Sequence, residues 1–186
     1  LTDLLEISRI DSGRVQLRAE DADIAALTLG VLDLVAVHIE AKGSQVVLDA
    51  PPEPVIAEVD STRIERILRN LIVNAIEHAE GSRIDVTIAK SDDAVAVRVR
   101  DHGIGMSPDV VKQVFDRFYR ADPSRKRTLG GTGLGLSIAL EDAALHGGTI
   151  IAWGWPQEGA SFLLTLPRHL GPDAGPGSFT EPGPLG

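Results

Sequence analysis

Three polar residues repeat at four-residue intervals within one amphipathic stretch, DSTRIERILRNLIVNAIEH. A helix would place Asn70, Asn74 and His78 in a single row along one side. Asparagine is a poor helix former because its amide competes for backbone hydrogen bonds, so both asparagines carry a local cost. Neutral amide oxygens suit a hard cation such as Mg²⁺, which takes water and phosphate oxygens as its other ligands. The row therefore indicates a magnesium site, and a solvated helix face is the alternative.

A second signal is a carboxylate between a strand and two glycines. The stretch VRVRDHGIGM runs from an alternating strand into Asp101, Gly103 and Gly105. The carboxylate can accept a hydrogen bond from an exocyclic amine, while the glycines let a flat heterocycle approach the backbone. Taken alone the signal is weak, because D-x-G-x-G also describes ordinary turns. The aromatic residues of VFDRFYRAD, which follow it, favour core packing when taken alone.

A third signal is the glycine-rich stretch GGTGLGLSIAL, which leads directly into an apolar helix. Backbone N–H groups in such a stretch can converge on phosphate oxygens, and the N-terminus of the following helix carries a partial positive charge. The spacing matches neither G-x-x-x-x-G-K-[ST] nor a G-x-G-x-x-G after a first strand, which excludes P-loop and Rossmann sites. A flexible connector is the alternative.

The charge balance limits the classes of ligand. The net charge of −9 argues against a nucleic-acid surface, yet five of the 18 Lys and Arg residues fall between Arg117 and Arg127. This basic segment favours a small anionic ligand, with a solvated loop as the alternative. The absence of cysteine excludes disulfides and thiolate zinc sites. By inspection, no apolar run reaches the roughly 18 to 20 residues that span a bilayer, so we expect a soluble chain.

The elements that must position these residues follow from periodicity. Helices are predicted over 24–39, 60–78 and 134–145, with strands over 45–48, 55–59, 84–88, 95–99, 149–153 and 161–166. Asp60 or Ser61 can cap the central helix. Such a mixed order predicts an α+β fold, a two-layer α/β sandwich with helices on one face of a mixed, mostly antiparallel sheet.

The ends of the chain differ in composition from its middle. LTDLLEISRIDSG is predicted to be part of a longer amphipathic helix, so residues 1–19 are expected to be a helix end and linker. Residues 20–170 form the main domain. Residues 171–186 hold five glycines and four prolines, too little apolar surface to offset chain entropy, and are predicted to be a disordered tail.

Together and in this order, these stretches resemble the sensor histidine kinase family, specifically its catalytic ATP-binding domain of the Bergerat (GHKL) type. The N box is RILRNLIVNAIEH, the G1 box DHGIG, the F box FDRFYR and the G2 box GGTGLGLSI. The resemblance covers about residues 1–170 and implies the Bergerat ATP-binding fold. LLEISRIDSG is similar to the end of the second dimerisation helix and its linker.

The resemblance also implies the residues of the site. Asn70 and Asn74 would be catalytic and would hold Mg²⁺ on the ATP phosphates, and Asp101 would read the adenine amino group. Residues 122–129 would form a mobile ATP lid. The implied nucleotide-binding residues are Asn70, Asn74, His78, Asp101, Gly103, Ile104, Gly105, Arg127, Gly130, Gly131, Thr132, Gly133, Leu134 and Gly135.

Two positions depart from the family pattern or vary within it. The position three after Asn74 is commonly Lys or Arg in the family and touches phosphate, but here it is Glu77. A carboxylate there would repel ATP, so we expect it to turn outward while Arg125, Lys126 or Arg127 supplies the positive charge. His78 stands where an aromatic residue often flanks the adenine, and an imidazole can stack there; a solvated helix end is the alternative.

The implied function is that of the kinase domain of a two-component sensor. None of the five histidines lies in a segment like S-H-E-L-R-T-P, so the acceptor histidine is expected on a dimerisation domain of the parent protein. The further implied partner is a cognate response regulator, with no nucleic acid. The parent is expected to be a homodimer anchored in the bacterial inner or plasma membrane, with this domain in the cytoplasm.

Other GHKL functions are the alternatives. The ATPases and anti-sigma serine kinases of this fold use a glutamate one turn before the metal-binding asparagine as a general base, where this chain has Asn70. An amide cannot accept the proton, whereas an imidazole nucleophile carries its own lone pair near neutral pH. A nucleotide-binding pseudokinase scaffold is a further alternative, favoured only by Glu77.

Overall fold

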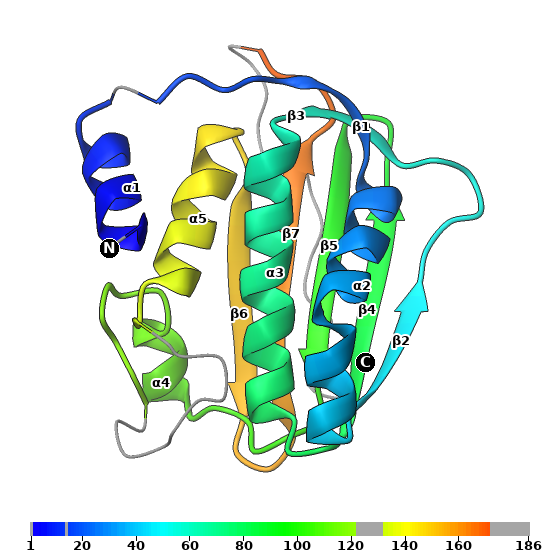
Figure 1. The fold of residues 1–186 in the computed structure, drawn as a ribbon, viewed down its shortest axis with the longest axis vertical. Helices are drawn as coiled ribbons and strands as arrows, with labels where there is room; N and C mark the ends of the chain where they lie inside the picture. Colours follow the sequence, from blue (N-terminus) through cyan, green and yellow to red (C-terminus); the bar gives the residue numbers. More distant parts are fainter. Residues whose placement is uncertain (1, 14, 122–131, 172–186) are drawn as a thin grey trace.

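Five strands form a sheet that carries helices on one of its faces (Figure 1). The structure is a computed structural model that describes residues 2–13, 15–121 and 132–171. The strand order is β2-β4-β5-β7-β6, and only the β2–β4 pair is parallel. These strands are β2 (Gln45–Asp49), β4 (Arg83–Lys90), β5 (Ala94–Asp101), β6 (Thr149–Trp155) and β7 (Gly159–Pro167). The predicted α+β sandwich with a mostly antiparallel sheet is confirmed.

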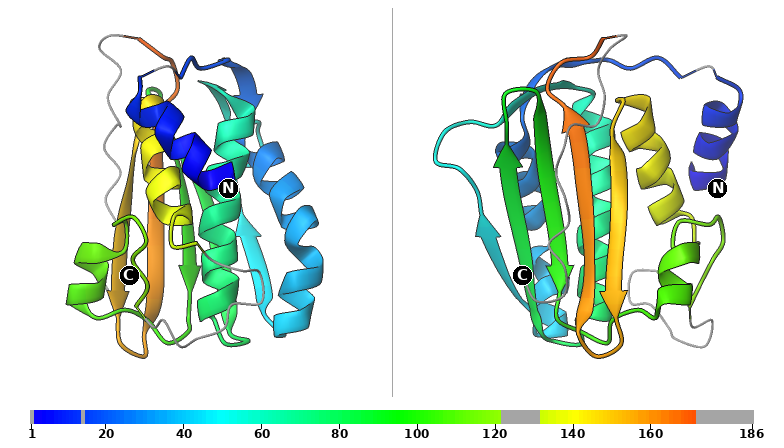
Figure 2. Two further views of the ribbon diagram at one scale, coloured as in Figure 1. Left: turned by 60° about the vertical axis from the view of Figure 1, so that its left-hand side comes forward. Right: turned by 180° about the vertical axis from the view of Figure 1, so that it is seen from behind.

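Three helices lie side by side on the sheet, with α3 (Ser61–His78) between α2 (Ile24–Lys42) and α5 (Gly135–Leu145). Figure 2 shows these helices from the side and the opposite face of the sheet from behind. The short helix α1 (Thr2–Asp11) lies against α5 on the outside of this layer, and α4 (Pro108–Gln113) lies near the start of α5. The helix layer therefore has α3 at its centre.

The apolar side of α3 forms the middle of the core. Its buried side chains follow the predicted i, i+3, i+4 pattern and pack against inward-facing residues of β4, β5 and β7. Burying each large apolar side chain contributes roughly 1.5 to 3 kcal/mol, so this face fixes the rotation of α3 about its axis. Asp60 caps the helix, since its side chain accepts from the backbone N–H of Arg63. The opposite side of α3 is consequently held toward α5 and the loops.

Strand β1 (Glu20–Asp23) was not predicted. It pairs antiparallel with β3 (Ile56–Val59) in a separate two-stranded sheet, with Glu20 opposite Val59. Its sequence, EDAD, has no apolar alternation, so only the pairing with β3 makes it a strand. Asp23, its last residue, caps α2 by accepting from the N–H of Ala25.

Helix α2 is longer than predicted. It continues to Lys42 and ends at Gly43, whose φ of 69° suits glycine. With 19 residues it is long and apolar enough, by length and composition, to cross a membrane, so the expectation that no run has this length was wrong. Such a test is weak evidence, because core helices also pass it. Here 22% of the apolar window is buried: Ile24, Val31 and Val35 lie in the core of the domain, whereas Leu29, Leu34 and Val37 are exposed.

A buried ionic cluster joins α1, α3 and α5. Asp142 of α5 is fully buried and accepts from Arg63 Nη1 at 2.7 Å, Arg66 Nε at 2.7 Å and Arg66 Nη2 at 2.8 Å. Glu6 of α1 accepts from the same two guanidinium groups, at 3.0 and 3.1 Å. Burial alone raises the pKa of Glu6, but the hydrogen bonds and charges of Arg66 and Arg63 hold it below its usual value. We refer to Asp142, Arg63, Arg66 and Glu6 as the ionic cluster.

The ionic cluster predicts a large effect of one substitution in α5. Asp142→Ala should lower the free energy of unfolding by about 3 kcal/mol or more, because it removes one side of a buried ion pair. The control is the neighbouring Glu141→Ala, which removes one of the carboxylate partners of the more exposed Arg117 and should cost much less, because exposed ion pairs contribute little. Urea denaturation of both variants measures this. Equal losses in the free energy of unfolding for the two variants would contradict the claim that the ion pairs of Asp142 contribute more than those of Glu141.

Candidate functional site

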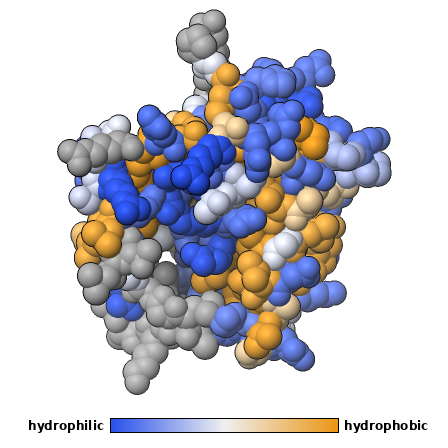
Figure 3. All heavy atoms as spheres, turned by 45° about the horizontal axis from the view of Figure 1, so that its top comes forward, coloured by the Kyte–Doolittle hydropathy of each residue, from blue (hydrophilic) through white to orange (hydrophobic). Residues whose placement is uncertain are grey.

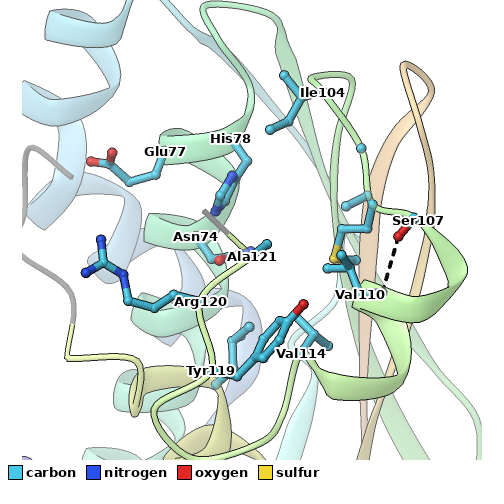
Figure 4. A pocket seen from close by; sticks show the side chains of 14 residues that line it. Asn74, Glu77, His78, Ile104, Ser107, Val110, Val114, Tyr119, Arg120 and Ala121 are labelled. Atoms are coloured by element: carbon cyan, nitrogen blue, oxygen red, sulfur yellow. Dashed lines mark hydrogen bonds between the residues drawn. The ribbon is translucent and has the colours of Figure 1, made fainter. Parts of the chain in front are cut away.

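A pocket of about 160 Å³ opens beside the C-terminal half of α3 (Figure 4). It is enclosed by α3, the segments 104–114 and 119–121, and the start of α5. Its lining consists of Asn74, Glu77, His78, Ile104, Gly105, Met106, Ser107, Val110, Val114, Tyr119, Arg120, Ala121, Leu136 and Ala160. The structure thus brings the predicted N box, G1 box and the end of the F box to one cavity.

The pocket has two chemically different ends. Figure 4 shows Glu77 and Arg120 on one side of Asn74, and an apolar wall that includes Val110 and Val114 on the other. An apolar wall suits a flat aromatic ring, while charged and amide groups suit a polar or anionic tail. The arrangement therefore fits an amphipathic ligand with one flat and one charged end.

The row on α3 is present, but its members do different things. Asn74 and His78 line the pocket. Asn70 is not among the lining residues, because its side-chain amide donates to the carbonyl of Gly135 at 2.9 Å. This bond joins α3 to the first residue of α5 and uses the amide nitrogen of Asn70, so that its oxygen can act as an acceptor. Gly135 is confined here, since a Cβ on it would lie 3.3 Å from that oxygen.

The start of α5 points its backbone donors toward this region. The helix begins at Gly135, one residue later than predicted, with Leu134 as its N-cap and no side-chain capping bond. Ser137 does not compensate, since its hydroxyl donates to the carbonyl of Leu134 at 2.9 Å. Among the described residues, the first turn of α5 therefore has no side-chain cap, and its N–H groups and partial positive charge lie beside Leu136, which lines the pocket.

The G2 box is described only from Thr132 onward. Thr132 donates its hydroxyl to Asp3 of α1 at 3.0 Å, and Leu134 is buried against Ile7 and Ile138. Gly133 has a φ of 75°, and a Cβ there would lie 2.9 Å from the backbone of Phe118. The predicted residues Arg127, Gly130 and Gly131 lie outside the described residues, as do Arg125, Lys126, the expected lid and residues 172–186 of the expected tail.

Asp101 lies behind the wall of the pocket. It is 1 % exposed, stands opposite the lining residue Ala160 in the β5–β7 register, and accepts from the N–H of Gly103 at 3.0 Å. Burial raises the pKa of Asp101 to about 6, although backbone hydrogen bonds from Gly103 and Ala160 oppose this. A buried carboxylate with so few donors is well suited to accept one more hydrogen bond from a ligand.

The two glycines of the G1 box are explained by close packing of the chain. A Cβ on Gly103 would lie 1.9 Å from the carbonyl oxygen of His78, and one on Gly105 would lie 1.9 Å from that of Trp155. These positions let the loop rest on the end of α3 and on the β6–β7 turn, and Ile104 donates its N–H to the carbonyl of His78 at 3.3 Å. Their identity is thus required by the fold, independently of any room they leave for a ligand.

Glu77 does not turn outward as expected. Its side chain is 4 % exposed and lines the pocket, with Oε2 3.3 Å from Lys42 Nζ at the end of α2. The other oxygen, Oε1, is buried without a hydrogen-bond partner among the described residues. The sequence analysis missed Lys42, because nothing in a single sequence shows that residues 35 positions apart meet.

The aromatic residues of the F box lie in three different environments. Phe115 packs edge-on against Phe162, with ring centroids 6.0 Å apart, as a core residue would. Tyr119 lines the pocket, and Phe118 is 60 % exposed with a φ of 64°. The expectation of core packing therefore holds for Phe115 and fails for Phe118.

A second hollow, of about 680 Å³, lies between α1, α2 and α3. Figure 3 shows hydrophilic residues across this face, beside a hydrophobic surface. Its lining includes Arg63 and Arg66, which are already paired with carboxylates in the ionic cluster. It contains neither predicted asparagine, so the first pocket is the better candidate site.

Comparison with known proteins agrees with this choice. The family described as histidine kinase-, DNA gyrase B- and HSP90-like ATPase matches residues 59–170. The sensor histidine kinase MtrB of Mycobacterium tuberculosis is 53% identical over 171 residues, which cover 92% of this chain and 30% of MtrB. The signal transduction histidine-protein kinase AfsQ2 of Streptomyces coelicolor is 43% identical over 183 residues, 96% of this chain and 32% of AfsQ2.

Solved structures give the same assignment. Full-length ShkA in complex with AMPPNP superposes with a TM-score of 0.78 at 27% identity, over 94% of this chain and 36% of ShkA. The catalytic domain of the histidine kinase ThkA gives 0.72 at 27% identity, over 82% of this chain and 97% of that domain. The histidine kinase AdeS of Acinetobacter baumannii, at 21% identity with a TM-score of 0.75 over 90% of this chain and 76% of AdeS, shares the fold.

The chain belongs to the histidine kinase-, DNA gyrase B- and HSP90-like ATPase family. Within it, the chain is an ATP-binding domain of the sensor histidine kinase type, which confirms the resemblance seen in its four boxes. It spans about a third of the length of the curated relatives it matches.

The raised pKa of Asp101 predicts a pH-dependent gain on substitution. Between the unfolded value of 3.8 and about 6, the folded state binds the extra proton, so stability falls as pH rises through this window. Asp101→Asn removes this penalty and should raise the free energy of unfolding at pH 7.5 by roughly 2 to 3 kcal/mol, with little gain near pH 4. Urea denaturation at both pH values measures the difference.

The control for this prediction is Asp85→Asn. Burial raises the pKa of Asp85, but hydrogen bonds from His102 and Arg83 hold it below its usual value, so its charged form stabilises the fold. Asp85→Asn should therefore lower stability at pH 7.5. A gain for Asp101→Asn that does not change with pH would contradict the raised pKa.

Proposed function

We propose that this chain is the kinase domain of a two-component sensor, which donates the γ-phosphate of ATP to a histidine on a dimerisation domain of the longer protein. The observation that carries the proposal is the pocket beside Asn74, with its apolar wall, its charged end and the uncapped start of α5. Relatives named as sensor histidine kinases at 53% and 43% identity support it.

The adenine is proposed to occupy the apolar end. Ile104, Val110 and Val114 supply contact surface, and His78 and Tyr119 supply rings that can stack on the base. A carboxylate such as Asp101 can accept from the exocyclic amine of adenine and gives no such bond to the carbonyl of guanine. The site would thereby favour ATP over GTP.

The triphosphate is proposed to extend toward Asn74 and the start of α5. The N–H groups of the first turn of α5, which has no side-chain cap, can donate to phosphate oxygens, with the helix dipole favouring the anion. The described residues contain no group of three His, Cys, Asp or Glu side chains for a metal. A magnesium ion would therefore depend on the amide oxygens of Asn74 and Asn70 together with phosphate and water, which suits a hard cation.

The residues near the phosphates favour a histidine acceptor over water. Asn70 cannot remove a proton from water or a hydroxyl, whereas a neutral imidazole attacks with its own lone pair. When bound, the metal would neutralise charge on the transferring phosphoryl group, and the protein would contribute positioning. This argument disfavours the ATPase and serine kinase alternatives.

The acceptor histidine is proposed to lie outside this chain. His146 is buried, with Nε2 accepting from the N–H of Asp60, and His102 pairs with Asp85 at 2.7 Å. His78 lines the pocket itself. We propose that residues 1–19 are the end of the dimerisation helix and its linker, that a response regulator takes the phosphoryl group, and that the parent is a membrane-anchored homodimer with this domain in the cytoplasm.

The proposal predicts binding with slow turnover. The 186-residue chain should bind ATP with Mg²⁺ present, hydrolyse it very slowly, and transfer γ-labelled phosphate to an added dimerisation domain that carries its acceptor histidine. Asn74→Ala should weaken magnesium-dependent ATP binding by about tenfold or more, since a metal ligand is lost. Calorimetry and phosphate-release assays measure these effects. Absence of ATP binding would overturn the proposal, and rapid hydrolysis without an acceptor would favour the ATPase alternative.

A further inference from the structure

The charged end of the pocket contains a carboxylate that is incompletely paired. Glu77 lies one turn after Asn74 on α3, and both side chains line the pocket. Only one oxygen of Glu77 has a hydrogen-bond donor among the described residues, and Oε1 is buried with none. Leaving a charged acceptor buried and unsatisfied is costly, so the position of this carboxylate beside a ligand pocket calls for an explanation.

The single donor to Glu77 comes from another helix. Lys42 is the last residue of α2, and its Nζ lies 3.3 Å from Glu77 Oε2. Its side chain is 30% exposed, so the ammonium group is reachable from solvent while the carboxylate is buried. The left-handed Gly43 ends the helix directly after Lys42, which places this side chain at the level of the last turn of α3.

Pairing with Lys42 offsets the repulsion that Glu77 would exert on an anionic ligand. An isolated carboxylate at this end would repel phosphate, and within a partly buried site the repulsion would be weakly screened. Lys42 cancels the charge. An ammonium group has three N–H donors, and among the described residues Glu77 takes one of them, so the other two can donate to phosphate oxygens.

We infer that Lys42 is a phosphate-binding residue of this site and that Glu77 is its positioning residue, an inference that rests on the proposed ATP-binding function. Position 77 is a carboxylate and supplies no cation, so the cation comes from Lys42 of α2. The Glu77 carboxylate holds the Lys42 ammonium group in place. This cation is independent of the basic residues expected in the lid.

The test uses variants that keep the pair neutral. Lys42→Met alone would leave Glu77 buried with no donor and could unfold the chain, so the main variant is Lys42→Met with Glu77→Gln. The charge-swapped variant, Lys42→Glu with Glu77→Lys, returns a cation to the same place. The control is Lys90→Met, because Lys90 has a matched exposure of 31% and pairs with Glu53 away from the pocket.

Calorimetric titration with Mg-ATP, Mg-ADP and adenosine separates the outcomes. The neutral double variant should bind Mg-ATP about tenfold more weakly, the order expected for one charge-assisted contact, with adenosine affinity unchanged. The swapped variant should recover most of this loss, and Lys90→Met should behave as the unaltered chain does.

Two results would overturn the inference while leaving the proposed function intact. In one, the unaltered chain binds Mg-ATP and the neutral double variant binds it equally well. In the other, ATP and adenosine affinities fall together, which would mean that the pair only holds α2 against α3. If the unaltered chain binds neither nucleotide, the proposed function fails and the inference fails with it.

Discussion

The arrangement of the site depends on one buried charge, the carboxylate of Asp142. A fully buried carboxylate must be compensated, and here Arg63 and Arg66 of α3 supply three hydrogen bonds to it. This fixes the C-terminal half of α5 to the N-terminal half of α3. At the other end of α5, Asn70 of α3 binds the carbonyl of Gly135. Two polar contacts, one at each end, therefore set where the first-turn N–H groups of α5 lie relative to Asn74.

The same arginines also hold the first helix. Glu6 of α1 shares Arg63 and Arg66 with Asp142, and Asp11, near the end of α1, accepts from Arg117 at 2.7 Å. The apolar contribution is small, since among the described residues the separate core cluster here comprises Ile7 with two residues of the α5 region. Helix α1 is thus attached mainly through charge. Displacing it would remove Glu6, one of the carboxylates that compensate the arginines on the N-box helix.

The sequence predicted those features whose physical cause is local. The face of α3 was predictable because Ile64, Leu68 and Leu71 report burial directly through their spacing, and the sandwich followed from the order of such elements. Strand β1 was not predictable, because its residues are polar and only pairing with β3 makes it a strand. The burial of Glu77 was not predictable either, since its partner Lys42 lies on another helix. Single-sequence reasoning thus singled out Asn74, His78 and Gly105, which the structure brings to one pocket, and missed the long-range contact between Glu77 and Lys42.

Three features around the pocket are unfavourable for the fold by itself. Asp101 is buried as a carboxylate with a raised pKa, Glu77 has an oxygen without a donor among the described residues, and α5 starts without a side-chain cap. Elsewhere on the same helices comparable groups are compensated: Asp142 has two arginines, and α3 is capped by Asp60. An amine at Asp101 would add a hydrogen bond to a carboxylate that already accepts from the backbone of Gly103 and Ala160, and phosphate oxygens would supply acceptors at the start of α5, which has no side-chain cap. Because these two demands differ in chemistry, a nucleotide meets both where a simple anion or an apolar molecule would meet at most one.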